Sequence, residues 1–245
     1  MTRYRIDIAY DGSDYGGWQI QPNAPSIQEE LQKAIKKVTG EKVIVHGSGR
    51  TDRGVHARMQ VAHFDFKKKR AAGSLLISLN AVLPWQIRVN RIRQVPSSFH
   101  ARRSVVSKEY RYFIWNDAVV SPFKKGHVTR VRKKLNIALM KKAASLLVGR
   151  KDFSSFIANP KYDLNTTVRS LTGLSVTQKG REIVITAVGE GFMYKMVRSL
   201  AGFLIRVGEG AIAPEKVLKI LSSRKRTAQV PTAPAEGLFL WRVRY

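Results

Sequence analysis

The sequence predicts a mixed α/β fold built from two split βαβ halves. Two observations carry this expectation. Apolar residues recur with period two in some segments and with helical spacing in others, and the resulting order of elements, β-α-β-β-α-β, occurs twice along the chain. At 245 residues with 44% hydrophobic content, the chain can bury either one large core or two smaller ones.

The first half begins with a strand over residues 3–10, in which every second residue is apolar (Tyr4, Ile6, Ile8, Tyr10). A helix then begins at Ser26, because Ser26 and Glu29 have the spacing of a capping box, and it ends at Gly40. The remaining elements of this half are strands at 42–46, 59–66 and 87–95 and a helix at 74–83 stopped by Pro84.

The second half repeats the order. It is predicted to contain strands at 107–115, 168–178, 181–189 and 238–245, helices at 132–148 and 192–207, and a further helix starting with Pro214. A boundary near residues 100–106 divides the chain into halves 1–103 and 104–245.

The charge balance points to a polyanionic partner. Lys and Arg number 44 against 17 Asp and Glu, which gives a net charge of +27, and the pI of about 10.8 is in the range typical of nucleic-acid-binding domains. Polyphosphate and an anionic membrane surface are the competing partners. Each basic run alone is typical of a solvated surface, but together the runs create a field that attracts phosphate backbones, at 67–70, 130–134, 141–142 and 224–226.

Several classes of protein are excluded by composition. The chain has no cysteine, which excludes disulfides, thiol nucleophiles and zinc fingers and fits a reducing cytoplasm. No apolar run reaches the roughly 18 residues of a membrane helix, and the first residues lack the apolar core of a secretory signal. We therefore expect a soluble, cytoplasmic protein that does not bind a membrane.

The densest group of chemically capable residues lies at 46–57, where a predicted strand enters a loop with three glycines around one carboxylate. Asp52 stands between Arg50 and Arg53, and these cations favour its ionised form. Such a carboxylate can act as a nucleophile, a general base or a metal ligand. The alternative is that Asp52 only caps the turn.

Two other functions of this loop are less well supported. A phosphate-binding P-loop needs a closing Gly-Lys-Ser/Thr, which the sequence lacks. A metal site could use His46, His56 and His63, but these residues do not have a recognised ligand spacing.

Two residues of the second half are candidates for the same site. Tyr110 lies in a strand where aromatic and cationic residues alternate, so its ring is either a sheet-face residue or a platform that stacks on an unpaired base. Arg198 is either an exposed helix cation or a partner of the carboxylate.

The loop resembles the signature of the TruA-type tRNA pseudouridine synthases, which modify uridines 38 to 40 of the anticodon stem-loop. The resemblance extends over most of the chain through a series of short motifs in the same order: Tyr10-Asp11-Gly12, Gly17-Trp18-Gln19, 49–57, 99–102, 108–112, 152–156, Gly191-Phe192, 196–198, Ala233-Pro234 and Gly237-Leu238. Two residues depart from the family pattern: Arg53 replaces a common alanine, and Lys195 occupies a place often filled by histidine.

The resemblance implies a function for each candidate. Asp52 corresponds to the catalytic aspartate, Tyr110 to the tyrosine that packs on the target base, Arg198 to the arginine that pairs with the aspartate, and Arg50 to the arginine that helps to extrude the base. It also implies two ferredoxin-like halves that form a continuous, mostly antiparallel sheet with helices on one side and a central cleft. The family acts as a homodimer on tRNA and uses neither a metal nor a cofactor.

Two rival functions follow from the same residues. A non-catalytic RNA-binding or chaperone-like protein would depend on the basic field alone and not on Asp52. A pseudouridine synthase for another RNA would share the aspartate but differ in its target.

Overall fold

A computed structural model gives the structure of residues 1–158 and 166–245. The chain forms two compact units. The first unit comprises Met1–Val106 together with Phe239–Tyr245, and the second comprises Ser107–Leu238. The last residues of the chain therefore belong to the same unit as the first.

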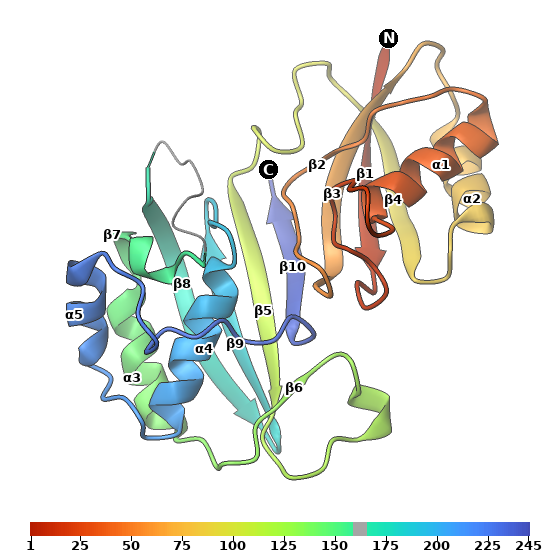
Figure 1. Cartoon of the computed structure of the whole chain (residues 1–245). Helices are drawn as coiled ribbons and strands as arrows, with labels where there is room; N and C mark the ends of the chain where they lie inside the picture. The colour runs from red at the N-terminus through yellow and green to blue at the C-terminus, as the bar shows by residue number, and fades with distance from the viewer. Residues whose placement is uncertain (159–165) are drawn as a thin grey trace. The chain divides into compact units, whose positions relative to one another are not determined.

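The first unit contains a sheet in the order β4-β1-β3-β10, with a short β2 paired to β3 (Figure 1). β1 pairs antiparallel with both β3 and β4, whereas β10 runs parallel to β3. Its elements are β1 (Thr2–Tyr10), α1 (Ile27–Thr39), β2 (His46–Gly47), β3 (His56–Phe66), α2 (Ala72–Val82), β4 (Ile87–Val95) and β10 (Leu238–Arg244). The order of elements predicted up to residue 95 is confirmed, whereas the strand predicted at 238–245 as part of the second half belongs to this unit.

The second unit contains a sheet in the order β5-β9-β8-β7, with a short β6 paired to β5. Apart from the parallel β5–β6 pair, neighbouring strands of this unit are antiparallel. Its elements are β5 (Ser107–Trp115), η1 (Pro122–Lys124), β6 (Thr129–Arg130), α3 (Ile137–Leu147), β7 (Gly149–Asp152), η2 (Ser154–Phe156), β8 (Val168–Lys179), β9 (Glu182–Gly189), α4 (Met196–Gly208) and α5 (Lys216–Ser223). A mixed α/β fold with mostly antiparallel strands is thus confirmed in each unit.

The helix α1 begins and ends where the sequence predicts. The Oγ atom of Ser26 accepts a hydrogen bond from the Glu29 N–H at 3.3 Å, and Gly40 takes a left-handed conformation with φ of 75°. Ile27, Leu31 and Ile35 are fully buried along one side of the helix. The cap and the apolar stripe together explain why this segment is helical.

Three predicted elements are wrong in extent. The helix predicted at 192–207 starts only at Met196, because Lys195 has a left-handed backbone conformation with φ of 54°. Residues 42–45 are not a strand, and pairing with β3 begins only at His46. The helix predicted at 132–148 starts at Ile137, because Asn136 provides its N-cap by accepting from the Leu139 N–H at 3.1 Å. Arg132 and its neighbours up to that cap are outside any helix.

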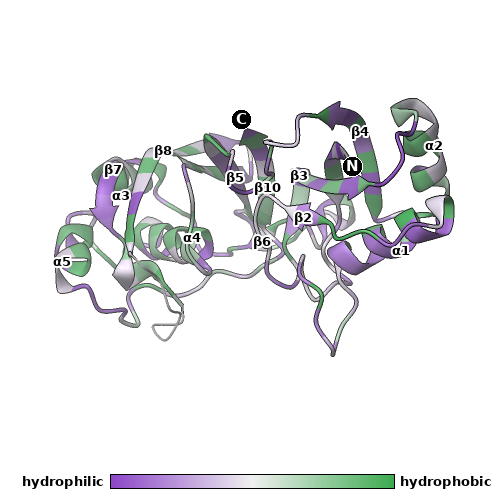
Figure 2. Cartoon of the chain, turned by 90° about the horizontal axis from the view of Figure 1, so that it is seen from above, coloured by the Kyte–Doolittle hydropathy of each residue, from purple (hydrophilic) through white to green (hydrophobic). Residues whose placement is uncertain are grey.

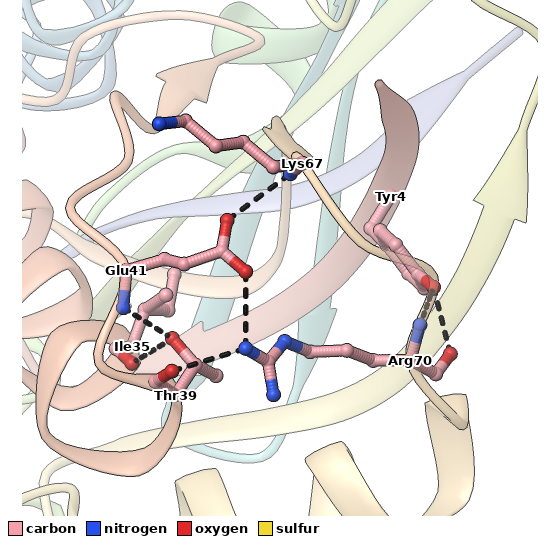
Figure 3. A network of polar contacts seen from close by, with 6 residues as sticks. All are labelled: Tyr4, Ile35, Thr39, Glu41, Lys67 and Arg70. Carbon is pink, nitrogen blue, oxygen red and sulfur yellow. Dashed lines mark hydrogen bonds and ion pairs between the residues drawn. The ribbon is translucent and has the colours of Figure 1, made fainter.

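One basic run has a structural function as well. Arg70 donates to the Thr39 carbonyl and to the Glu41 carboxylate, both at 3.0 Å, and its backbone exchanges two hydrogen bonds with the Tyr4 hydroxyl (Figure 3). The Lys67 N–H donates to the other oxygen of Glu41 at 3.0 Å, and this bond lowers the pKa of Glu41. The segment that leads into α2 is therefore fixed to the end of α1 and to β1.

In the described parts of the chain, no helix is long and apolar enough to cross a membrane.

Candidate active site

The loop that carries Asp52 occupies residues 48–55, between β2 and β3. The end of β1 and the segment that follows it hold the loop in place from one side. We call the residues that make these contacts the clamp: Tyr10, Gly12, Gly17 and Trp18. The backbone N–H of Trp18 donates to the Thr51 carbonyl at 3.1 Å, and the Tyr10 hydroxyl lies 2.9 Å from Thr51 Oγ1. Trp18 is itself 2% exposed. The backbone of the loop is thus held next to Asp52 by two buried aromatic residues.

Two glycines make this close approach possible. A Cβ atom on Gly12 would lie 2.1 Å from the Val55 carbonyl oxygen, and one on Gly17 would lie 2.5 Å from the Thr51 carbonyl oxygen. Gly17 also has φ of 111°, which favours glycine. No larger residue fits at either place without displacing the loop, which explains why these positions of the sequence carry glycine.

A buried polar pair supports the loop from below. Ser48 donates to the Gln60 Oε1 atom at 2.6 Å, and Gln60 Nε2 donates to the Gly49 carbonyl at 3.0 Å. Both side chains are fully buried, so these bonds satisfy groups that would otherwise be costly to bury. The sequence does not single out Gln60, because a lone glutamine in a strand carries no signal before its partners are known.

Asp52 itself is half-buried at the turn of this loop. The turn is closed by the main chain, since the Val55 N–H donates to the Asp52 carbonyl at 3.1 Å, and Gly54 has φ of 75°. Arg50 lies two residues earlier and is exposed. Its Nε–H donates to Gln19 Oε1 at 3.1 Å, so the guanidinium group lies next to the residue that follows Trp18 of the clamp.

The histidines of the alternative metal site are not brought together. His46 and His63 stack with ring centroids 5.0 Å apart, but His56 lies at the opposite end of β3 from His63. Seven steps along the strand, at about 3.3 Å each, place them about 23 Å apart. His56 instead packs on Phe239 with centroids 4.5 Å apart, and its hydrogen bond to Asp11 lowers the pKa of that carboxyl.

Tyr110 lies on β5, in the second unit, opposite Ala187 of β9. Its side chain is 8% exposed and packs edge-on against Phe192, with ring centroids 5.2 Å apart. Tyr112 extends from the same face of the strand, donates to the Pro234 carbonyl at 2.9 Å, and lies 2.7 Å from Thr129 Oγ1. Burial raises the pKa of Tyr112, so it remains a neutral hydroxyl.

Arg198 is the third residue of α4 and is held by a strap of chain at residues 231–234. Its Nε–H donates to the Ala233 carbonyl at 2.8 Å, and its own carbonyl accepts from the Ala233 N–H at 3.0 Å. A Cβ atom on Gly202, one turn later, would lie 2.1 Å from the Pro231 carbonyl oxygen. The strap therefore fixes the orientation of the guanidinium group.

A second arginine ties this strap to the helix. Arg226 donates to the Ser199 Oγ and Thr232 Oγ1 atoms, each at 2.8 Å. In the sequence Arg226 belongs to a basic run at 224–226, which does not indicate this function. The only sequence signal was the motif at Ala233-Pro234, which marks the strap without naming its partners.

The four candidate residues thus fall into two pairs. Arg50 and Asp52 share one loop of the first unit, and Tyr110 and Arg198 lie on β5 and α4 of the second. Lys195, one of the two departures from the family pattern, precedes α4 with φ of 54° and places its Nζ atom 4.8 Å from the Tyr194 ring centre. Arg53, the other, is exposed.

Comparison with known proteins gives a consistent result. The family described as tRNA pseudouridine synthase matches residues 8–102 and 143–245, which include the Asp52 loop and α4. The chain is 43% identical to the tRNA pseudouridine synthase A of Brevibacillus brevis and 44% identical to that of a Thermoanaerobacter species. The protein of the same name from Listeria welshimeri is 40% identical. Each of these alignments covers 100% of both chains.

Proposed function

Because the chain belongs to the tRNA pseudouridine synthase family, we propose that it converts uridine to pseudouridine at positions 38, 39 and 40 in the anticodon stem-loop of tRNA. The reaction breaks the bond between N1 of uracil and C1′ of ribose, turns the detached ring, and joins its C5 to C1′. N1 gains a hydrogen and C5 loses one, so the substrate is isomerised without any net gain or loss of atoms.

Asp52 is the proposed catalytic residue. Hydrolysis of a glycosidic bond commonly needs two carboxyl groups, one to activate water and one to protonate the leaving group. Isomerisation returns the leaving base to the same sugar, so one carboxylate suffices. A covalent adduct of the Asp52 oxygen, at C1′ of the sugar or at C6 of the ring, would divide the reaction into two easier steps.

The rigid loop around Asp52 is the observation that carries this proposal. Trp18, Tyr10 and the glycines at 12 and 17 hold the loop backbone in place before any substrate is bound. With the loop backbone fixed, only the side-chain torsions of Asp52 remain to be ordered in the reaction, which supports a catalytic function.

Arg50 is proposed to assist base flipping. A uridine within a stem must leave its stack before it can react, which costs a few kcal/mol. Arg50 is exposed, lies two residues before Asp52, and donates a hydrogen bond to Gln19. Its guanidinium group can occupy the space left by the base while its charge meets the backbone phosphates.

Tyr110 and Arg198 complete the proposed site. A phenol ring such as that of Tyr110 holds a flat uracil without fixing its rotation in the plane, which the turning step requires. Arg198 is proposed to pair with the Asp52 carboxylate and to orient it through charge-assisted hydrogen bonds. Its anchoring by the strap at Ala233 supports a fixed orientation.

We further propose that the substrate is bound by a homodimer and that the reaction takes place in the cytoplasm. The net charge of +27 supports a polyanionic substrate the size of tRNA. The lack of cysteine is consistent with a reducing compartment.

Site mapping tests the proposal directly. An unmodified tRNA transcript with uridines at 38, 39 and 40 is incubated with the purified protein, and pseudouridine is mapped by carbodiimide treatment and primer extension. We expect modification at these positions and none in a fragment of ribosomal RNA. Modification of the ribosomal fragment alone would favour a synthase for another RNA, and none in either would favour the non-catalytic function.

A further inference from the structure

Two residues that take no part in the proposed reaction meet at the C-terminal end of the Asp52 loop. His56 follows that loop as the first residue of β3, and Asp11 is the first residue after β1. His56 Nδ1 lies 3.1 Å from Asp11 Oδ1 and 3.1 Å from the backbone nitrogen of Gly12. The loop is therefore attached at this end to the turn that follows β1.

The carboxyl group of Asp11 is fixed on its own side of the contact. Its Oδ1 atom accepts from the Ser13 N–H at 3.0 Å and from the Ser13 hydroxyl at 2.6 Å. The Asp11 N–H donates to the Gln86 carbonyl at 2.9 Å. The hydrogen bond to His56 lowers the pKa of the Asp11 carboxyl, and the bonds from Ser13 add to this effect against the opposing effect of burial. An ionised carboxylate in a fixed position thus faces the imidazole at neutral pH.

The ring of His56 is fixed as well. It is fully buried and stacks on Phe239, with ring planes 21° apart. Phe239 lies opposite His56 in the parallel pairing of β10 with β3, and these two strands run side by side in Figure 2. The ring therefore joins three segments of the first unit: the end of the Asp52 loop, the turn after β1, and β10.

The Nδ1 atom of His56 can bond to the turn in either protonation state. A protonated Nδ1 donates to the Asp11 carboxylate, and an unprotonated Nδ1 accepts from the Gly12 N–H. Because Nδ1 has a bonding partner in both states, the connection does not depend on which ring nitrogen carries the proton. This arrangement is that of a support for the loop, not of a group that exchanges protons with a substrate.

The position of His56 is passed on to Asp52 through one short turn. The Val55 N–H, one residue before His56, donates to the Asp52 carbonyl at 3.1 Å, so a shift of His56 moves the turn that carries Asp52. Trp18 of the clamp holds the other side of Asp52 at the Thr51 carbonyl. We propose that Asp11 and His56 are positioning residues, which hold Asp52 in place for its reaction with uridine. This inference rests on the proposed function and adds two residues to its site.

Single-turnover kinetics at saturating protein separate a positioning function from a structural one. Asp11→Ala removes the carboxylate, and His56→Leu removes the ring nitrogens while it keeps a buried apolar side chain. We expect each change to slow pseudouridine formation in an anticodon arm by about 10- to 100-fold, because a small displacement of a reacting group costs this much. Affinity for the RNA, measured by filter binding, should stay within about threefold of the wild type.

Two further variants test the contact itself. The double variant Asp11→Ala/His56→Leu should react no more slowly than the slower single variant, since both changes remove the same contact. Asp11→Asn keeps an oxygen that accepts from Ser13 and from His56, so it should recover the rate to within about threefold of the wild type.

Asp65→Ala is the matched control. Asp65 forms an ion pair with Arg3 at 2.8 Å, between the same two strands but near the opposite end of β3. This variant should react at the wild-type rate. Wild-type rates in Asp11→Ala and His56→Leu, multiplying losses in the double variant, an Asp11→Asn variant as slow as Asp11→Ala, or a rate and an affinity that fall together would each overturn the assignment.

Hydrogen exchange of residues 49–57 in the free protein tests the same contact without any measurement of activity. Exchange should be faster in Asp11→Ala and His56→Leu than in the wild type and in Asp65→Ala. An inactive wild type with this pattern would refute the proposed function but not the attachment of the loop. An active wild type without this pattern would refute the positioning function of the pair alone.

Discussion

At the scale of single residues, the site depends on close backbone contacts that leave no room for a side chain. Sequence motifs located these positions at Gly12, Gly17 and Trp18 without revealing what they do. In the structure Gly12 lies against the Val55 carbonyl group, and Gly17 and Trp18 lie against the Thr51 carbonyl group. These two carbonyl groups stand on either side of Asp52 in the loop. The motif therefore marks a packing requirement as much as a chemical one.

Gly17→Ala should remove most of the activity. The added methyl group would lie 2.5 Å from the Thr51 carbonyl oxygen, and the residue would be held at φ of 111°, so the loop must move. We expect turnover to fall at least about tenfold and stability to fall by about 1–2 kcal/mol. Gly40→Ala is the control: its φ is also positive, but a Cβ atom there meets nothing. It should lose about 1 kcal/mol of stability and no activity. Equal activity of the two variants in a single-turnover assay would refute the clamp.

A second residue-scale prediction concerns pH. His63 is 2% exposed, and burial lowers its pKa to about 4, with Arg3, His100 and His46 acting in the same direction and Asp65 opposing them. The folded protein therefore favours the neutral ring. Above pH 6.5 the ring is neutral in both the folded and the unfolded chain, so His63 does not reduce the free energy of unfolding. As the pH falls from 6.5 toward 4, the unfolded chain binds a proton that the folded protein does not, and the free energy of unfolding decreases progressively.

Urea unfolding at pH 7 and pH 5 measures this effect. The wild type should lose stability over this interval, and His63→Gln should lose less, although it is less stable at pH 7 because the ring no longer packs on His46. If His63→Gln loses as much stability between pH 7 and pH 5 as the wild type does, another group is responsible for the pH dependence.

At the scale of elements, the sequence predicted those helices and strands that have a local signal. The helix α1 has both a capping serine and a terminal glycine, and its ends are confirmed. The segment 42–45 is rich in β-forming residues but does not pair, because strand formation depends on a partner that propensity does not supply. The start of α3 was missed because Asn136 caps it inside a segment whose composition is helical.

The strap along α4 gives an element-scale prediction. Gly202→Ala places a methyl group 2.1 Å from the Pro231 carbonyl oxygen, so it should displace the strap and with it Arg198. We expect a loss of activity of at least about tenfold together with about 1–3 kcal/mol of stability. Gly180→Asn, in the turn between β8 and β9 where nothing lies within 4 Å, should leave activity unchanged. Normal turnover by Gly202→Ala would mean that the strap does not position Arg198.

At the scale of the whole molecule, composition indicates the class of partner but not which basic side chains are used within the protein itself. The net charge indicated a polyanion from the sequence alone. It could not show that Arg70 and Arg226, both in basic runs, are used to fix segments of their own unit. Only contacts between residues far apart in the chain separate such structural cations from those left to bind RNA.

Salt should weaken tRNA binding strongly. Neutralising several phosphates releases counterions, so the logarithm of the association constant should fall linearly with the logarithm of the salt concentration. Between 50 and 200 mM KCl we expect affinity to fall by at least about 100-fold, measured by filter binding. A nearly flat dependence would show that the excess charge does not bind the tRNA backbone.

Replacement of Asp52 by Asn tests the central claim most directly. Tritium release from tRNA labelled at C5 of uridine reports the reaction, and filter binding reports tRNA affinity. Asp14→Asn, an exposed carboxylate changed in the same way, is the control and should behave as the wild type. We predict that Asp52→Asn releases no tritium above background while its tRNA affinity stays within about threefold of the wild type. Tritium release at the wild-type rate would contradict the assignment of Asp52 as the reacting carboxylate.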